Sequence, residues 1–150
     1  MTQLQKEIKI SKFENIFHQA LNSIIFTYHW SSQQIKDILI PYNITPQQYS
    51  VLRILRSQYP SPSTINLIKS RTIDKMSDTS RIVDRLIYKD YLKKTANHYD
   101  KRAVDIIITE KGLHLLKRMD KEVDFNSIVS PKLNEEVAAQ LNFLLDKMRS

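Results

Sequence analysis

The side chains best suited to bind a charged partner fall in two short stretches of the chain. The first combines short polar side chains with two arginines one helical turn apart, at Ser77, Asp78, Thr79, Ser80, Arg81 and Arg85. The second stretch, Asp100, Lys101 and Arg102, lies in a polar segment further along. Hydroxyl groups hydrogen-bond base edges or phosphates at close range, and guanidinium groups bind guanine edges and phosphates. The alternative interpretation of Arg81 and Arg85 is that they are solvated helix charges without a ligand.

Positive charge is concentrated around these two stretches. Between Ser63 and Ala103 there are ten Lys or Arg against five Asp. This excess makes up most of the formal net charge of +7 of the 150-residue chain. Such a patch favours a polyanionic partner, either nucleic acid or an anionic membrane, and predicts salt-sensitive binding. We expect no membrane partner, because the basic residues flank a helix and a hairpin instead of one strongly amphipathic helix.

Composition also argues against several other chemistries. The chain has no cysteine and a single glycine, which removes disulfides, thiol chemistry and Gly-rich phosphate loops. No nucleophile–base pair or paired carboxylate set stands out, so we expect neither an enzyme nor a cofactor. The four histidines lack the spacing of a zinc site, so we also expect no metal: His18, His29, His98 and His114. Without an apolar run of ~20 residues or a signal-peptide core, a cytoplasmic protein is the expectation.

The spacing of apolar residues at i, i+3, i+4 and i+7 predicts a mostly helical chain. The predicted helices cover residues 11–39, 45–58, 64–71, 78–89, 110–123 and 134–148. For all but the first of them an N-cap can be named, in order Thr45, Ser63, Ser77, Thr109 and Asn134. The first helix would be ~44 Å long, which extends beyond one compact core. We therefore expect a second subunit to cover part of its apolar stripe.

After Tyr91 the apolar period changes from that of a helix to that of a strand. Residues 92–96 and 104–109 are predicted strands, since β-branched residues dominate and Val104, Ile106 and Ile108 alternate. The polar residues 97–103 between them form the exposed tip of a hairpin. Two short helices, a turn and a hairpin together predict a winged helix-turn-helix, whose second helix enters the major groove of DNA. The fold class is thus mostly α with a small β-hairpin wing.

Three segments resemble the MarR (multiple antibiotic resistance regulator) family of winged helix-turn-helix transcriptional regulators. Residues 77–86 resemble the family's recognition helix, and residues 45–55 resemble its second helix. Residues 100–104 followed by 108–112 resemble its wing and the start of its next helix. One departure is Asp90, where the family usually has glycine after the recognition helix. Aspartate tolerates the left-handed conformation that such a helix end often needs, so the resemblance survives this departure.

The resemblance implies a single domain over residues 1–150 that forms a two-fold homodimer. Helices in 11–40 and 110–150 would form the dimer interface, and 45–109 would be the DNA-binding lobe. Arg81 would bind in the major groove and Arg102 in the minor groove, with Asp100 orienting an arginine near the wing. The implied function is a sequence-specific regulator, a ligand-responsive repressor that reads a pseudo-palindromic operator in double-stranded DNA. The alternative is a winged-helix protein that acts through protein or RNA partners.

An aromatic cluster near the end of the first helix is a candidate effector pocket. Tyr28, His29 and Trp30 could line a small-molecule site between the dimer core and the DNA-binding lobe, where the family commonly binds effectors. The alternative is that these rings pack in the core or at the subunit interface. Of the two, packing in the core or at the interface is the favoured interpretation.

Overall fold

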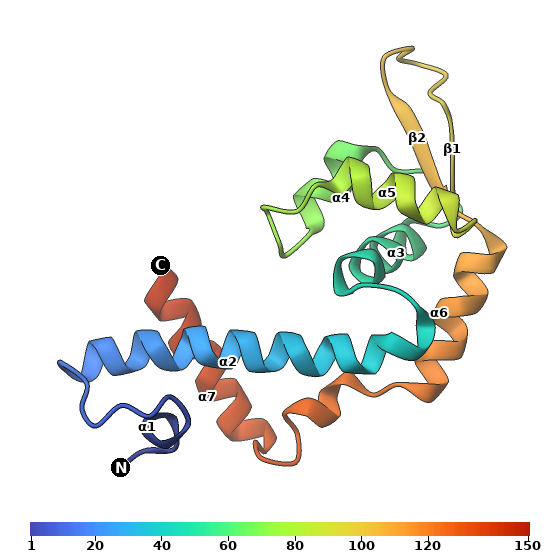
Figure 1. Ribbon diagram of the computed structural model, residues 1–150. Helices are drawn as coiled ribbons and strands as arrows, with labels where there is room; N and C mark the ends of the chain where they lie inside the picture. Colours follow the sequence, from blue (N-terminus) through green and yellow to red (C-terminus); the bar gives the residue numbers. More distant parts are fainter. The chain divides into compact units, whose positions relative to one another are not determined.

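The computed structural model describes all 150 residues, Met1–Ser150, and its contacts divide the chain into two units. Unit 1 comprises Met1–Asp37 and Asn126–Ser150, and unit 2 comprises Ile38–Phe125. The elements are α1 (Gln3–Glu7), α2 (Ile16–Leu39), the 3-10 helix η1 (Ile40–Tyr42), α3 (Pro46–Gln58), α4 (Ile65–Arg71), α5 (Thr79–Tyr88), β1 (Leu92–Ala96), β2 (Val104–Ile108), α6 (Glu110–Glu122), the 3-10 helix η2 (Phe125–Ile128) and α7 (Glu135–Arg149) (Figure 1). The predicted fold class is confirmed.

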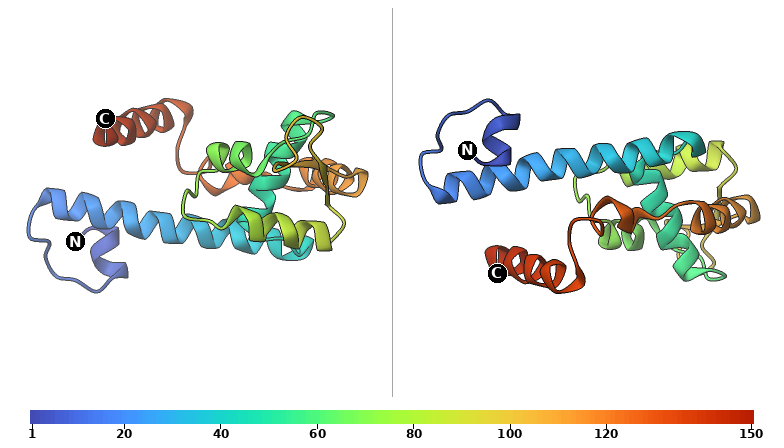
Figure 2. Two further views of the ribbon diagram at one scale, coloured as in Figure 1. Left: turned by 90° about the horizontal axis from the view of Figure 1, so that it is seen from above. Right: turned by 90° about the horizontal axis from the view of Figure 1, so that it is seen from below.

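The start of α2 differs from the sequence-based prediction. The helix was expected from residue 11, but it begins at Ile16, and both views of Figure 2 show it as one uninterrupted helix. The Oδ1 atom of Asn15 accepts a hydrogen bond from the backbone N–H of His18 at 2.9 Å, which caps the first turn. Phe13 precedes this cap, and its buried ring meets the ring of His18 edge to face. Phe13 therefore fits the apolar pattern because its side chain is buried, although the residue lies outside the helix.

Helix α3 is the centre of unit 2. It contacts α4, α5, α6 and β2, and α4 and α5 contact each other, so that these elements enclose one core. The side chains at the middle of this core are wholly or almost wholly buried, among them Leu52, Leu55, Leu86, Ile106 and Leu116. Figure 2 shows α4 and α5 side by side when the molecule is seen from above, and in Figure 1 the hairpin projects beyond them. Burial of these apolar side chains is the main favourable contribution to the stability of the unit.

The N-caps of α4 and α5 lie one residue later than predicted. Thr64, not Ser63, caps α4, because the backbone of Ser63 is paired with Ile106 of β2 in both directions at 2.8 Å. Asp78, not Ser77, caps α5 by accepting a hydrogen bond from the backbone N–H of Arg81 at 3.2 Å. Ser77 instead belongs to the preceding turn, where its hydroxyl donates to the carbonyl of Asp74. The predicted caps Thr45, Thr109 and Asn134 are confirmed.

The junction between α5, the hairpin and α6 depends on two special residues. Asp90 has a φ of 62°, which is the left-handed conformation that the sequence predicted just after α5. Strand β1 then pairs antiparallel with β2, from Leu92 opposite Ile108 to Ala96 opposite Val104. A Cβ atom on Gly112 would lie 2.6 Å from the carbonyl oxygen of Tyr91. Only glycine therefore lets the first turn of α6 approach the hairpin this closely.

Helix α6 is grouped with the DNA-binding lobe expected from the sequence and not with the terminal helices. The sequence placed the boundary at residues 109 and 110, whereas unit 2 extends to Phe125. The reason is packing, because Leu115, Leu116 and Met119 of α6 are buried in the core of unit 2.

Unit 1 leaves most of its large apolar side chains exposed. Helix α7 has no buried residue, and in α2 only Leu39, which belongs to unit 2, is buried. The exposed apolar residues of these two helices are Ile16, Phe17, Leu21, Ile25, Tyr28, Trp30, Val137, Leu141, Phe143, Leu144 and Met148. No helix in the structure has both the length and the apolar composition that crossing a bilayer requires.

Candidate nucleic-acid interface

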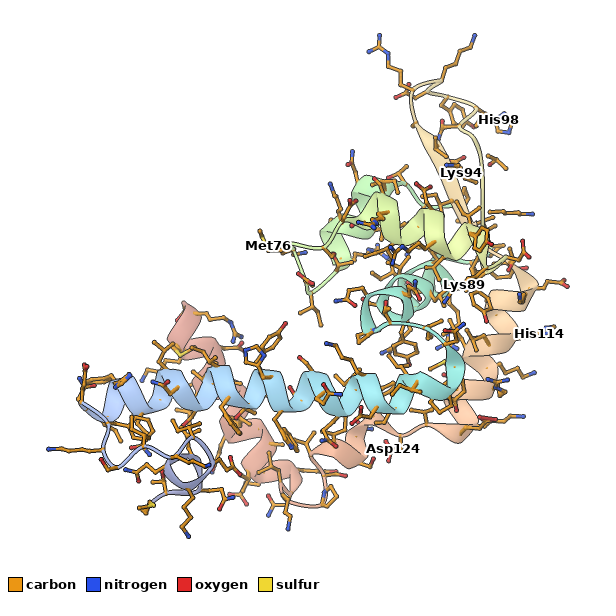
Figure 3. The ribbon with its side chains drawn as sticks, viewed as in Figure 1. Met76, Lys89, Lys94, His98, His114 and Asp124 are labelled. Carbon is orange, nitrogen blue, oxygen red and sulfur yellow. The ribbon has the colours of Figure 1, made fainter.

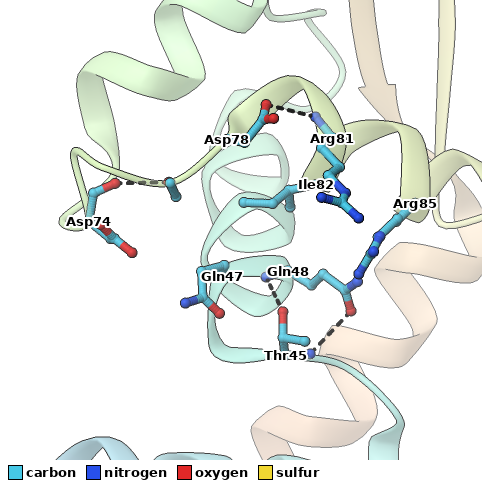
Figure 4. Close-up of a pocket in the computed structure, with 9 residues that line it drawn as sticks. Thr45, Gln47, Gln48, Asp74, Asp78, Arg81, Ile82 and Arg85 are labelled. Carbon is cyan, nitrogen blue, oxygen red and sulfur yellow. Dashed lines mark hydrogen bonds between the residues drawn. The ribbon is translucent and has the colours of Figure 1, made fainter.

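The two predicted arginines of α5 share one face of the helix. Arg81 and Arg85 line a shallow pocket together with Asp78 of the same helix and with Gln47 and Gln48 of α3 (Figure 4). Both arginines are exposed, and neither forms an ion pair within the chain. Their guanidinium groups are therefore free to bind an external anion or a hydrogen-bond acceptor.

The remaining predicted residues of this helix have different surroundings. Ser80 and the capping Asp78 are exposed, and Ser77 is half-buried. Thr79, by contrast, is 1% exposed, so its side chain cannot reach a bound duplex. The prediction for Thr79 needs correction because it shares the inward face of α5 with Val83 and Leu86, four and seven residues later, which are both buried.

Asp84, one residue before Arg85, forms an ion pair with a lysine of the hairpin. Its Oδ1 atom lies 3.3 Å from the Nζ atom of Lys94 on β1. Other lysines of the basic stretch also have partners within the fold. Lys75 donates to the carbonyl oxygens of Lys69 and Ser70 at the end of α4, at 3.3 and 2.9 Å. These cations stabilise the lobe, which leaves the unpaired arginines as the stronger candidates for a ligand.

The second predicted stretch lies at the tip of the hairpin, and Figure 3 labels His98 there. Lys101 and Arg102 are exposed and form no ion pair. Asp100, for which the resemblance implied a role in orienting an arginine near the wing, contacts the backbone of Arg102. Its Oδ1 atom accepts a hydrogen bond from the backbone N–H of Arg102 at 2.9 Å. The carboxylate therefore fixes where this arginine leaves the main chain and does not neutralise its guanidinium.

Asn97, which the sequence reasoning missed, is the most extensively bonded side chain of the tip. Its Oδ1 atom accepts hydrogen bonds from the backbone N–H groups of Tyr99 and Asp100, at 2.8 and 2.9 Å. Its Nδ2 group donates to the carboxylate of Asp105 at 2.8 Å. The preference of asparagine for turns, where it bonds the backbone two residues on, was the signal that could have found it.

The aromatic cluster proposed as an effector pocket lies on α2, in unit 1. Tyr28 is 64% exposed and Trp30 is 43% exposed, and the rings of Tyr28 and His29 meet edge to face at 5.3 Å. These rings are not core residues of the single chain. The effector pocket stays a prediction.

Comparison with known proteins gives a family match that lies within unit 2. The model of the MarR family matches residues 44–104, which contain α3, α4, α5, β1 and the hairpin tip. The multiple antibiotic resistance protein MarR of Escherichia coli K12 is 27% identical over 116 residues, which are 76% of this chain and 79% of that protein. The protein of the same name from Salmonella typhimurium is 26% identical over the same length.

Solved structures with the same fold cover most of the chain. A mutant of E. coli MarR in complex with operator DNA has a TM-score of 0.77 at 23% identity and covers 90% of this chain and 99% of that chain. BpsR of Bordetella bronchiseptica, whose DNA binding is regulated by 6-hydroxynicotinic acid, has a TM-score of 0.73 at 19% identity. That match covers 88% of this chain and 99% of the other.

Proposed function

We propose that this chain, whose residues 44–104 match the MarR family, is a transcription regulator of that family that binds duplex DNA sequence-specifically as a homodimer. The observation that carries the proposal is that unit 2 has two clusters of cationic side chains without ion-pair partners in the chain. One is on α5, at Arg81 and Arg85, and the other is on the hairpin tip, at Lys101 and Arg102. A helix fits the major groove, and a cationic hairpin tip suits the minor groove beside it.

Each predicted residue has a role in this proposal. Arg81 reads a guanine edge in the major groove, and Arg85 binds in the groove or on an adjacent phosphate. Ser77, Asp78 and Ser80 approach base edges or phosphates from the first turn of the helix. Lys101 and Arg102 bind in the minor groove, with Asp100 holding the backbone of Arg102. Salt-sensitive binding follows, because each neutralised phosphate releases counterions.

A homodimer supplies the missing cover for the apolar faces of unit 1. The many large apolar side chains exposed on α2 and α7 are typical of a subunit interface. We propose that helices within 11–40 and 110–150 form this interface and that 45–109 carries the DNA contacts. A two-fold dimer would present two α5 helices to successive major grooves, ~34 Å apart, and so read a pseudo-palindrome.

We propose a repressor whose DNA affinity depends on a small molecule bound near Tyr28, His29 and Trp30. BpsR, which shares the fold, has its DNA binding regulated by 6-hydroxynicotinic acid, which supports a ligand-responsive function for this fold. A ligand shifts the equilibrium only by its differential affinity for the two states of the dimer. A regulator of this kind acts in the cytoplasm and performs no chemistry on its ligand, so we infer no enzymatic activity.

The test begins with the selection of binding sequences from random duplexes by the purified full-length protein. Fluorescence anisotropy at fixed salt then compares the wild type with Arg81→Ala and Arg102→Ala. We expect each variant to weaken binding by roughly 1–3 kcal/mol, with relaxed specificity in the first. Lys6→Ala removes an exposed cation of unit 1 that lies outside both the proposed dimer helices and the DNA-binding lobe, so this control should bind as the wild type does. Unchanged affinity in both test variants, or stronger competition by RNA than by duplex DNA, would refute the assignment.

A further inference from the structure

The hairpin tip, residues 97–103, is held together by side-chain hydrogen bonds to its own backbone. Of its seven residues, Asn97 and Ala103 are half-buried and the others are exposed. Asn97 and Ala103 are the two ends of the tip, and the backbone N–H of Asn97 donates a hydrogen bond to the carbonyl of Ala103 at 3.4 Å. The tip is thus a closed loop with a defined base.

The amide of Asn97 connects three points of this loop. Its oxygen accepts from Tyr99 and Asp100 at the turn, and its nitrogen donates to Asp105 on the returning strand. These partners leave no choice in the orientation of the amide, because two backbone donors need the oxygen and a carboxylate needs the nitrogen. Asp105 is itself held in register opposite Thr95 of β1.

Asp100 connects the residues bonded by Asn97 to Arg102. Its side chain accepts from the backbone N–H of Arg102 at 2.9 Å, and its carbonyl accepts from the backbone N–H of Ala103 at 3.0 Å. The bonds therefore run from Asn97 to Asp100 and from Asp100 to Arg102. Loss of the Asn97 amide would free Tyr99 and Asp100 at once and loosen Arg102 indirectly.

This frame presents a tyrosine that has no partner in the chain. Tyr99 is 100% exposed, and Lys101 and Arg102 follow it two and three residues later in the same tip. A tyrosine ring offers a large apolar surface, and its hydroxyl offers a hydrogen-bond donor. The minor groove presents hydrogen-bond acceptors, N3 of adenine and O2 of thymine, along its floor. An exposed tyrosine in the same tip as an arginine therefore supplies side chains that suit that surface in both shape and polarity.

We propose that Asn97 is a positioning residue for DNA binding, which holds Tyr99 beside Arg102 so that both contact the same stretch of minor groove. The inference rests on the proposed function and adds two residues to the site. Pre-ordering the tip lowers the conformational entropy that would otherwise be lost when the duplex binds. Asn97 acts through the backbone of the tip, whereas Tyr99 touches the DNA.

The experiment uses full-length protein and a duplex selected by the wild type. Asn97→Ala and Tyr99→Ala should each weaken binding about 3- to 10-fold in fluorescence anisotropy, a size typical of losing one ordered side chain at an interface. Thr95→Ala, an exposed strand position with no side-chain hydrogen bond, is the control in the same hairpin and should match the wild type. The thermal midpoint of each variant is measured alongside, to check that the lobe remains folded.

A modified duplex separates positioning from a general loss of structure. Replacing adenine by 2,6-diaminopurine in the flanking A·T pairs adds an amino group to the minor groove and leaves the major-groove edge unchanged. Wild-type affinity should fall on this duplex, and Asn97→Ala should be clearly less sensitive to it. In the free protein, Asn97→Ala should also speed amide hydrogen exchange at Tyr99 and Asp100, with the amides of α5 unchanged.

A reciprocal exchange provides the rescue. Asn97→Asp alone keeps an acceptor for both backbone donors but places two carboxylates side by side, so binding should weaken. Combining it with Asp105→Asn restores the side-chain hydrogen bond between positions 97 and 105 with donor and acceptor reversed, and the two backbone hydrogen bonds to position 97 are kept. Binding should then return to within about twofold of the wild type.

Two results would overturn the inference while the proposed function stands. One is wild-type affinity in Asn97→Ala, and the other is weakened binding that responds to diaminopurine as strongly as the wild type. Failure of the wild type to bind any selected duplex would overturn both.

Discussion

The two units of this chain bury their apolar side chains to very different extents. All but one of the buried hydrophobic residues lie in unit 2, the exception being Phe13. The element pairs with the most extensive contacts also all lie in unit 2. Unit 1 has two long helices, α2 and α7, yet most of their large apolar side chains are exposed.

Apolar periodicity alone therefore does not distinguish a core helix from an interface helix. The stripe on α6 and the stripe on α7 look alike in sequence, but Leu116 of α6 is fully buried and Leu144 of α7 is 60% exposed. Exposed apolar surface of this extent is costly in water unless another surface covers it. The core of unit 2 is therefore complete within one chain, whereas the exposed stripes of unit 1 are the surface that the proposed homodimer would cover.

The largest effect is expected from a charge in the exposed stripe of unit 1. Leu144→Glu should convert the dimer to a monomer at micromolar concentration, because the carboxylate would be buried without a partner in the interface. Analytical ultracentrifugation measures the change. Asn142→Glu adds the same charge on the opposite side of α7 and should remain dimeric. A dimer that persists in Leu144→Glu would remove the distinction between the two units.

The next largest effect concerns the core of unit 2. Leu116→Ala should lower the free energy of unfolding by about 2–5 kcal/mol, since a fully buried leucine leaves a cavity. Urea unfolding in the Leu144→Glu background isolates the single chain. Leu141→Ala in α7 should cost less than about 1 kcal/mol there, because its side chain is already 41% exposed. Equal costs at the two positions would contradict the comparison.

A smaller effect is expected where α6 approaches the hairpin. In Gly112→Ala the new methyl group would lie 2.6 Å from the carbonyl oxygen of Tyr91 and 2.7 Å from Cγ1 of Ile108. We expect a loss of about 1–3 kcal/mol from overpacking, measured by urea unfolding. His114→Ala, at a more accessible position of the same helix (Figure 3), should change stability little. A Gly112→Ala protein as stable as the wild type would mean that α6 and the hairpin can move apart at little cost in free energy.

The smallest effect concerns Tyr42, at the start of unit 2. Its hydroxyl donates to Oε2 of Glu122 at 2.7 Å, and this bond, with some desolvation and the nearby carboxylate, raises the pKa of Tyr42 above its ordinary value of 10.0. A pKa raised by folding stabilises the protein below the ordinary value, and this stabilisation is lost as the pH rises through the folded pKa.

The urea midpoints of the wild type and Tyr42→Phe test this contact. The wild type should be slightly more stable at pH 8, and the difference should shrink above pH ~10, where the phenol ionises. A difference that grows with pH would show that the contact favours the ionised form of the phenol and lowers its pKa.

Much of the candidate site was predictable because its elements carry local signals. Thr45 and Pro46 mark the start of α3 by capping and by a fixed φ, and Asp90 marks the end of α5. Arg81, Arg85, Lys101 and Arg102 are exposed, as expected of charged residues on those elements. The sequence wrongly placed Thr79 on the DNA-facing surface of α5. A threonine at the edge of an apolar stripe can face either solvent or the core, and only the residues packed against it decide which.

What the sequence alone determined is the order of the helices, the hairpin and the location of positive charge, since each depends on residues within a few positions of one another. Tertiary structure decided which stripes are buried within the chain, why the single glycine is needed at 112, and how Asn97 orders the hairpin tip. Those features depend on atoms brought together from distant positions, which periodicity and propensity do not describe.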